Sequence, residues 1–409
     1  MANSNLANAK KVKNDEFYTQ YSDIQKEIEA YLEYDSNAFK NKTVYSNCDD
    51  PVESNFFRYF VLNFKRLGLK QLIATSYKPS PVANTQLGLF GDDVTLAPDK
   101  GRPKITANKF VINEVGDVDD DGSFTLEDIA KQLKANKNNE WTPLEGDGDF
   151  RSEECVELLN QADIVITNPP FSLFREYVKQ LFDYKKQFLI IGNMNSITYK
   201  EVFPLLKENK CWLGNNYKVN GGAMFFSIPE NIANLDQVRE VRLDKNGKKD
   251  FITRVQGVRW FTNIDHGRRH EPLPLMTMGD NLKFSKHKEV KGKTSYDRYD
   301  NYNAIEVPYI DAIPSDYNGV MGVPVSFFDK HNPDQFQIIG YEKSYELRTK
   351  TYPKQLQISK TGKKTHVTKL NDGAAIKVSA PPDDMTYYVV DNEYYVQAYK
   401  RIFIKHKNK

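Results

Sequence analysis

Short apolar runs alternate with amphipathic helical segments along much of this chain of 409 residues. This alternation is typical of an α/β fold, in which helices connect the strands of a mostly parallel sheet. The expected strands are residues 43–48, 71–77, 162–167 and 188–191, and the expected helices are residues 54–67, 152–161 and 173–182. Residues 223–228 and 257–262 are expected to form an antiparallel hairpin that completes the sheet. We therefore predict a doubly wound α/β sheet.

The strand expected over residues 162–167 ends in Asn168, Pro169, Pro170 and Phe171. In open α/β sheets ligands bind beyond the carboxyl ends of the strands, and a Pro-Pro corner has a rigid backbone. The Asn168 side-chain oxygen and the carbonyl of Pro169 or Pro170 can accept both hydrogens of an exocyclic amine such as N6 of adenine, while Phe171 stacks on the base. Asn-Pro-Pro is also an ordinary strand-ending turn, so the corner alone leaves both interpretations open.

Several other segments accompany this corner. They are Asp15-Glu16-Phe17-Tyr18-Thr19-Gln20, Tyr45-Ser46-Asn47-Cys48-Asp49-Asp50-Pro51, Asn55-Phe56-Phe57, Gly148-Asp149-Phe150-Arg151 and residues 332–340. Together they resemble the EcoRI-type adenine-specific DNA methyltransferases through most of the chain. The resemblance implies a restriction-modification enzyme with a Rossmann-like S-adenosylmethionine-dependent sheet. It would methylate N6 of an adenine flipped out of double-stranded DNA, without a covalent enzyme intermediate and with the Pro170 carbonyl preferred as the second acceptor.

The resemblance also implies a set of cofactor-binding residues. They are Phe17, Tyr18 and Thr19 at the methionine part, Asn47, Asp49 and Asp50 after the first strand, and Asp149 and Phe150 at the adenine ring. The turn after the first strand lacks the glycines that usually let a backbone approach this cofactor, a departure that EcoRI-type members share. One of Asp49 and Asp50 is equally suited to cap the following helix, and the partner of the ribose stays open.

DNA recognition is expected in the C-terminal part of the chain. Residues 265–409 hold 23 Lys and Arg against 18 Asp and Glu, a net of +5, whereas the whole chain has a net charge of +2. Basic residues bind phosphates, and aromatic residues stack on bases. The expected DNA contacts are Trp260, Phe261, Arg268, Arg269, Lys291 and Lys293, with Tyr296, Tyr299 and Tyr302 nearby. We therefore expect a catalytic domain over residues 1–264 and a target-recognition region over residues 265–409.

A long insertion, about residues 78–148, interrupts the expected sheet. Its segment Gln86, Leu87, Gly88, Leu89 and Phe90 resembles the short peptide by which bacterial replication proteins dock on the DNA sliding clamp. The alternative is an apolar anchor that packs on its own domain. Further on, the aspartates from Asp117 to Asp128 match a calcium loop except for its last ligand, or form a polar turn before a helix over residues 126–134.

The remaining features exclude several classes of protein. Cys48, Cys155 and Cys211 are far apart, which argues against a disulfide framework or a zinc site, and His266 and His270 lack the adjacent Glu of a zinc helix. No apolar run of membrane-spanning length occurs, so a cytoplasmic monomer without a metal is expected. Two competing functions remain: methylation of RNA adenine or a protein amide by the same corner, and a non-catalytic DNA-binding protein.

Overall fold

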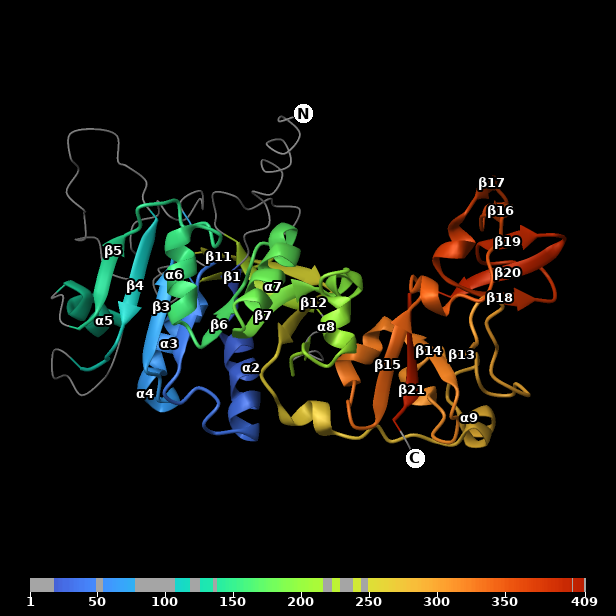
Figure 1. Cartoon of the computed structure of the whole chain (residues 1–409), viewed down its shortest axis with the longest axis horizontal. Helices are drawn as coiled ribbons and strands as arrows, with labels where there is room; N and C mark the ends of the chain where they lie inside the picture. The colour runs from blue at the N-terminus through green and yellow to red at the C-terminus, as the bar shows by residue number, and fades with distance from the viewer. Residues whose placement is uncertain are drawn as a thin grey trace. The chain divides into compact units, whose positions relative to one another are not determined.

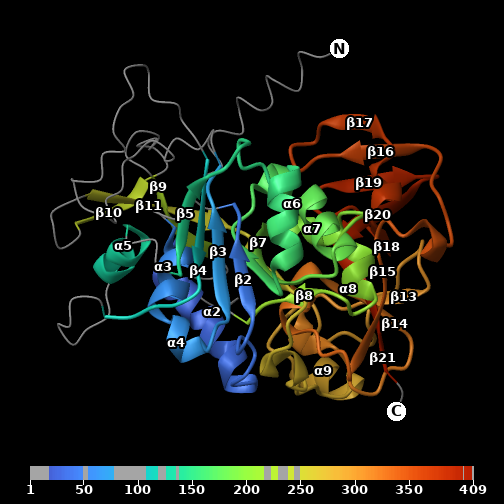
Figure 2. The same ribbon diagram turned by 60° about the vertical axis from the view of Figure 1, so that its left-hand side comes forward.

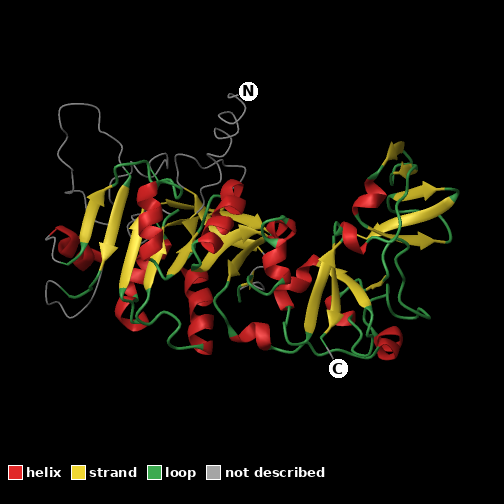
Figure 3. Ribbon diagram, in the orientation of Figure 1, coloured by secondary structure: helices red, strands yellow, loops and turns green. Residues whose placement is uncertain are grey.

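The computed structural model describes residues 18–48, 54–77, 107–117, 126–134, 138–215, 223–228, 238–243, 249–398 and 400–407. The chain divides into two compact units, which are considered separately (Figure 1). The first, called the N-terminal unit, comprises Met1–Leu206 and Lys210–Gly267, and the second, called the C-terminal unit, comprises Lys207–Asn209 and Arg268–Lys409. Helices and strands are mixed in both units, so the predicted α/β class is confirmed (Figure 3).

The N-terminal unit is built on an eight-stranded sheet with the order β5-β4-β3-β2-β6-β7-β12-β8. Its strands are β2 (Thr43–Ser46), β3 (Gln71–Thr75), β4 (Asn108–Ile112), β5 (Glu140–Pro143), β6 (Ile164–Thr167), β7 (Gln187–Asn193), β8 (Trp212–Leu213) and β12 (Val258–Thr262). The central strands β3, β2, β6 and β7 are parallel, whereas the outer pairs are antiparallel. Because β2 has β3 on one side and β6 on the other, the strand order reverses there, as at the ligand-binding point of open α/β sheets.

Helices cover both faces of this sheet. The described α-helices are α2 (Tyr21–Tyr34), α3 (Asn55–Leu62), α4 (Phe64–Leu67), α5 (Leu126–Lys134), α6 (Glu153–Gln161), α7 (Phe174–Asp183), α8 (Phe203–Lys207) and α9 (Met278–Phe284). Val44, Leu72 and Ile166 pack in one core with residues of α2 and α3, while α6 and α7 contact β2 and β7 from the opposite face. Figure 2 shows the sheet between α3 and α4 on one side and α6 and α7 on the other.

The helix boundaries follow from local sequence signals. The Ser54 side chain accepts a hydrogen bond from the Phe56 N–H at the start of α3, and Ser152 accepts one from Cys155 at the start of α6. Such caps satisfy N–H groups that have no partner within the helix. The helix predicted over residues 54–67 is confirmed, with a break at Asn63 between α3 and α4, and it ends at Gly68 in the left-handed region with a φ of 63°.

A second sheet of the N-terminal unit has the order β1-β9-β11-β10. Its strands are β1 (Tyr18–Thr19), β9 (Ala223–Ile228), β10 (Val238–Leu243) and β11 (Lys249–Gln256). The predicted hairpin of residues 223–228 with residues 257–262 is therefore wrong. β9 pairs with β1 and β11, while β12 pairs with β7 and β8 in the large sheet.

The C-terminal unit contains two further sheets, with the orders β13-β14-β21-β15 and β17-β16-β19-β20-β18. Their strands are β13 (Ala304–Glu306), β14 (Val320–Pro324), β15 (Phe336–Tyr341), β16 (Gln355–Ile358), β17 (Lys364–Val367), β18 (Ala374–Val378), β19 (Tyr387–Val390), β20 (Glu393–Ala398) and β21 (Arg401–His406). A partly buried ion pair at 2.5 Å joins Arg401 of β21 to Glu306 of β13. Among the described helices, none combines the length and the apolarity that crossing a membrane requires.

Candidate active site

The Asn-Pro-Pro-Phe corner lies at the carboxyl end of β6, as predicted. Phe171 begins a short 3-10 helix that leads directly into α7. Pro169 is buried, whereas Asn168 and Phe171 are half-buried, and Phe171 packs against the core that contains α2 and α3. The Pro170 carbonyl already accepts a hydrogen bond from the Leu173 N–H at 3.0 Å. No described residue donates to the Pro169 carbonyl, so this carbonyl is more available than that of Pro170 to accept a hydrogen bond from a ligand.

Two hydrogen bonds hold the end of β2 against the end of β6. The Ser46 hydroxyl donates to the Ile166 carbonyl at 2.7 Å, and the Cys48 N–H donates to the Thr167 hydroxyl at 3.2 Å. Asn47, between these anchors, is buried with 2% of its surface exposed. The predicted cofactor residue Asn47 and the corner residue Asn168 therefore follow neighbouring strands at the same edge of the sheet.

Tyr177 of α7 connects Asn47 with the loop that precedes α6. Its hydroxyl donates to the Asn47 side-chain oxygen, and its ring packs edge-on against Phe150 with the centroids 5.0 Å apart. Tyr177 is fully buried. The sequence predicts only that it belongs to a helix, over residues 173–182. Its phenolic hydroxyl is the feature of the sequence that could have indicated a polar contact here, because a buried Tyr O–H needs a hydrogen-bond partner.

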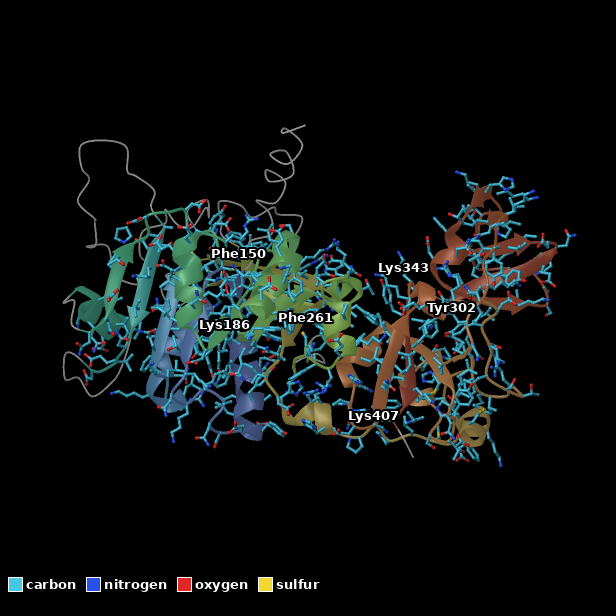
Figure 4. The ribbon with its side chains drawn as sticks, viewed as in Figure 1. Phe150, Lys186, Phe261, Tyr302, Lys343 and Lys407 are labelled. Carbon is cyan, nitrogen blue, oxygen red and sulfur yellow. The ribbon has the colours of Figure 1, made fainter. Side chains whose placement is uncertain are left out.

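Gly148 explains how this loop reaches the sheet edge. Its φ is +79°, and a Cβ built on it would lie 2.0 Å from the Ser76 carbonyl oxygen just beyond β3. Only glycine has both the conformation and the space. The close approach brings Asp149 and Phe150 to the carboxyl end of β3, beside β2. Figure 4 labels Phe150 in the upper part of the N-terminal unit.

Asp149 is held as an anion by Arg151. Burial raises the pKa of the Asp149 carboxyl group. The hydrogen bonds and the charge of Arg151 together lower this pKa by more than burial raises it, so the pKa lies below its ordinary value. The guanidinium forms two of these bonds, at 2.7 and 2.9 Å, and also pairs with Glu176 at 2.9 Å. Phe150 is only 5% exposed, which leaves little of its ring open to a ligand.

The predicted methionine-contacting segment lies beside the start of α3. Tyr18 and Thr19 are buried in β1, and the Asn55 side-chain amide donates to the Thr19 carbonyl at 2.7 Å. The Thr19 hydroxyl is buried without a hydrogen-bond partner among the described residues. A buried hydroxyl and a buried amide fit a polar ligand such as S-adenosylmethionine. Phe17, Asp49 and Asp50 lie outside the described residues, so their predicted roles stay predictions.

The prediction that Trp260 and Phe261 contact DNA is wrong for both residues. They lie on β12 inside the large sheet, and their exposed fractions are 2% and 0%. Trp260 packs on Phe56 and Phe261 packs on Phe174, with centroid distances of 5.9 and 5.1 Å. Successive strand residues point to opposite faces, so the two rings fill the two cores on either side of the sheet. Figure 4 labels Phe261 within the N-terminal unit.

The predicted basic residues differ in their surroundings. Arg269 is buried and donates to the Asn209 side chain within the C-terminal unit. Arg268 is half-buried, Lys291 is exposed, and Lys293 is exposed and pairs with Asp297 at 2.5 Å. The nearby aromatic residues Tyr296, Tyr299 and Tyr302 are buried core residues rather than a stacking surface.

Two predictions for the insertion concern residues that are largely not described. Gln86, Leu87, Leu89 and Phe90 lie outside the described residues. Asp117 and Asp128 are described, Asp128 as a buried residue of α5, but most of the segment between them is not. In the described part of the chain, no group of three His, Cys, Asp or Glu side chains is arranged to hold a metal ion.

Comparisons with known proteins show the family to which the chain belongs. A model of the family "Adenine-specific methyltransferase EcoRI" matches residues 5–407. The type II methyltransferase M.EcoRI of Escherichia coli is 43% identical over 346 residues, which cover 84% of this chain and 91% of that protein. M.MpnI of Mycoplasma pneumoniae and M.MgeORF184P of Mycoplasma genitalium are each 35% identical over 331 residues, which cover 81% of this chain and 83% and 84% of those proteins. No solved structure matches. The resemblance seen in the sequence is thus confirmed, and the chain belongs to the EcoRI family of adenine-specific methyltransferases, which methylate DNA with S-adenosylmethionine as the methyl donor.

Proposed function

We propose that the Asn168 corner is the catalytic centre of this adenine-specific DNA methyltransferase. The hydrogen bonds that join the ends of β2 and β6 carry this proposal, because they hold Asn47 and Asn168 at one edge of the sheet. In such sheets this edge is where ligands bind. The reaction is transfer of a methyl group to N6 of one adenine in a specific sequence of double-stranded DNA.

The corner orients the target amine through two acceptors. The Asn168 side-chain oxygen and the Pro169 carbonyl each accept one N6 hydrogen, and Pro169 replaces Pro170 as the second acceptor because the Pro170 carbonyl is bonded to Leu173. With both hydrogens held, the nitrogen lone pair turns out of the ring plane and becomes a better nucleophile. Phe171 stacks on the flipped base, whose removal from the duplex gives the amine access to the pocket.

Three described groups would hold S-adenosylmethionine. They are the Thr19 hydroxyl, the Asn47 amide and the Asp149 carboxylate, and Asp49 and Asp50 are proposed to complete the set. When bound, the cofactor supplies an electrophilic methyl group. The two acceptors at the corner then hold the N–H bonds of the methylated amine until water takes the extra proton, so that no Ser, Cys or His nucleophile or base is needed.

The finer description of the architecture is part of the same proposal. The parallel centre of the large sheet, with helices on both faces, supports a Rossmann-like catalytic domain. The division of the chain after Gly267 supports separate roles for the two units. The basic excess of the C-terminal part supports target recognition there, with Arg268, Lys291 and Lys293 as candidate DNA contacts.

The remaining proposals concern the setting of the enzyme. Cys48, Cys155 and Cys211, all of them described residues, form no disulfide, which is compatible with a cytoplasmic location, and the protein is proposed to act as a monomer. Docking on a sliding clamp through Leu89 and Phe90 also stays a proposal. It predicts that a double alanine variant at these two positions loses clamp binding in a pull-down assay.

Methyl transfer from labelled S-adenosylmethionine tests the proposed function directly. Unmethylated genomic DNA, RNA and a protein mixture are incubated separately with the enzyme, and labelled bases are mapped. We expect N6-methyladenine at one short DNA motif. Label in RNA or protein alone would instead favour the competing substrates of the same corner, and no label in any of the three would favour a non-catalytic DNA-binding protein.

A further inference from the structure

A stacked pair of side chains, Arg175 and Tyr199, borders the catalytic corner. Arg175 lies in the first turn of α7, four residues beyond Phe171, and Tyr199 follows the 3-10 helix Met194–Thr198 at the end of β7. β6 and β7 are parallel neighbours, with Thr167 opposite Ile190. Both segments therefore leave the sheet at the edge where the target base is proposed to bind.

The Arg175 guanidinium is held in place without being neutralised. Its Cζ lies 4.0 Å from the centroid of the Tyr199 ring, a cation–π arrangement that supports the flat face of the group and leaves its N–H edge available. The side chain is exposed, and it forms no ion pair with any carboxylate in the described part of the chain. The adjacent carboxylate, Glu176, pairs with Arg151 instead.

The same rim carries further positive charge. Gly192 near the end of β7 is covered by the Phe174 ring, since a Cβ there would lie 2.4 Å from Phe174 Cε2. Its cross-strand partner is Arg259 on β12. Arg259 points to the same face of the sheet as Phe261, which packs on Phe174. Lys200, whose side chain is 86% exposed, follows Tyr199 directly and pairs with Glu201 at 3.7 Å.

We propose that Arg175 binds a DNA phosphate next to the target adenine, with Tyr199 supporting the guanidinium. This inference rests on the proposed function of the corner. A base that leaves the stack takes its sugar with it, so the phosphates on either side of it cross the rim of the pocket. A guanidinium matches two phosphate oxygens with parallel hydrogen bonds. Arg175 is therefore a positioning residue on the catalytic unit, which fixes the strand without reading its sequence.

A double-mutant cycle tests this contact by changing Arg175 in the enzyme and one phosphate in the DNA. After the target motif is mapped, duplexes are made in which a neutral methylphosphonate replaces, one at a time, each phosphate within two nucleotides of the target adenine. For wild type, we expect kcat/KM to fall about tenfold at one position, the size of a single charge-assisted contact. On unmodified DNA, the kcat/KM of Arg175→Ala should be about tenfold below that of wild type. Neutralising the sensitive phosphate should not lower the kcat/KM of Arg175→Ala any further, because the variant already lacks the contact.

Control variants separate this contact from general effects of charge or folding. Lys65→Ala removes an exposed cation from α4, which precedes β3 at the opposite edge of the sheet, and it should respond to each methylphosphonate as wild type does. Tyr199→Phe keeps the stacked ring, so its kcat/KM should still fall about tenfold when the sensitive phosphate is neutralised. Tyr199→Leu removes the ring and should reduce the response, which provides a test even if Arg175→Ala is unstable.

An equal loss in Arg175→Ala and wild type at every neutralised phosphate would overturn the inference. Binding of S-adenosylmethionine, measured by calorimetry, should be the same in wild type and Arg175→Ala. A decrease on mutation would assign Arg175 to the cofactor site and contradict the phosphate contact. Failure of the wild type to methylate any duplex would refute the proposed function itself, an outcome visible before any variant is compared.

Discussion

Tyr177 joins the proposed cofactor site to the helix that begins at the catalytic corner. Its hydroxyl fixes the Asn47 amide, and its ring packs against Phe150. Tyr177→Phe keeps the ring and removes only the hydroxyl. We expect the KM for S-adenosylmethionine to rise about fivefold, since one buried hydrogen bond contributes about 1 kcal/mol, with little change in kcat.

The matched control for this substitution is Tyr184→Phe. Tyr184 lies at the end of the same helix with 37% of its surface exposed, so its steady-state constants should equal those of wild type. A Tyr177→Phe enzyme with an unchanged KM for S-adenosylmethionine would show that the hydroxyl does not position Asn47 for binding.

Local signals made the Asn-Pro-Pro-Phe corner and the starts of two helices predictable from the sequence. The Asn-Pro-Pro-Phe corner combines a strand end with a rigid turn, and Ser54 and Ser152 are helix caps within a few residues of the groups they bond. Trp260 and Phe261 could not be placed in the same way. An aromatic residue in a strand has the same local pattern whether its face is buried or open, and only the packing of distant helices decides between them.

At the scale of elements, the loop before α6 depends on Gly148. In Gly148→Ala, a Cβ would meet the Ser76 carbonyl oxygen, and the backbone would be strained at a φ of +79°. We expect the free energy of unfolding in urea to fall by about 1 to 3 kcal/mol. The affinity for S-adenosylmethionine should fall as well, because Asp149 and Phe150 follow directly.

Gly146→Ala is the matched control in the same loop. A Cβ at Gly146 has no other atom within 4 Å, so this variant should unfold at the same urea concentration as wild type. Equal stability of the two alanine variants would contradict the role given to the close approach of Gly148 to β3.

Strand pairing was the part of the fold that the sequence predicted least well. The strands β2, β3, β6 and β7 and the helices between them are confirmed because each has its own hydrophobic pattern and end signals. The partner of β9 is not encoded locally. β9 pairs with β1, about 200 residues earlier in the chain, and a sequence pattern does not distinguish this pairing from the expected one with residues 257–262.

At the scale of the whole molecule, stability should depend on pH through Glu342 of the C-terminal unit. Its side chain accepts a hydrogen bond from the Arg401 N–H at 2.8 Å. Burial raises the pKa of Glu342 to about 7, although that hydrogen bond and the charges of Lys400, Arg401 and Lys343 oppose the shift. Figure 4 labels Lys343, the next residue along the chain.

The folded protein therefore holds this proton more tightly than the unfolded chain does. The free energy of unfolding should fall as pH rises from the ordinary Glu value of 4.5 to about 7, and then level off. Glu342→Gln removes this dependence. Relative to wild type it should gain about 3 kcal/mol between pH 4 and pH 8, an order-of-magnitude value from the size of the shift.

Denaturant unfolding of both proteins at several pH values measures this difference. Glu346→Gln changes an exposed carboxylate of the same unit and should retain the pH dependence of wild type. Parallel curves for wild type and Glu342→Gln would show that folding does not change the pKa of the Glu342 carboxyl group.

The central claim is that Asn168 activates N6 of the target adenine, and its most direct test is the single-turnover rate of methyl transfer. Wild type, Asn168→Ala and Asn160→Ala are compared at saturating S-adenosylmethionine and duplex. Asn160 is an exposed residue of α6 and its variant should react at the wild-type rate. Asn168→Ala should be at least about a hundredfold slower, the usual loss when one oriented polar contact to the reacting group is removed, while both ligands still bind. A rate within about twofold of wild type would contradict the claim.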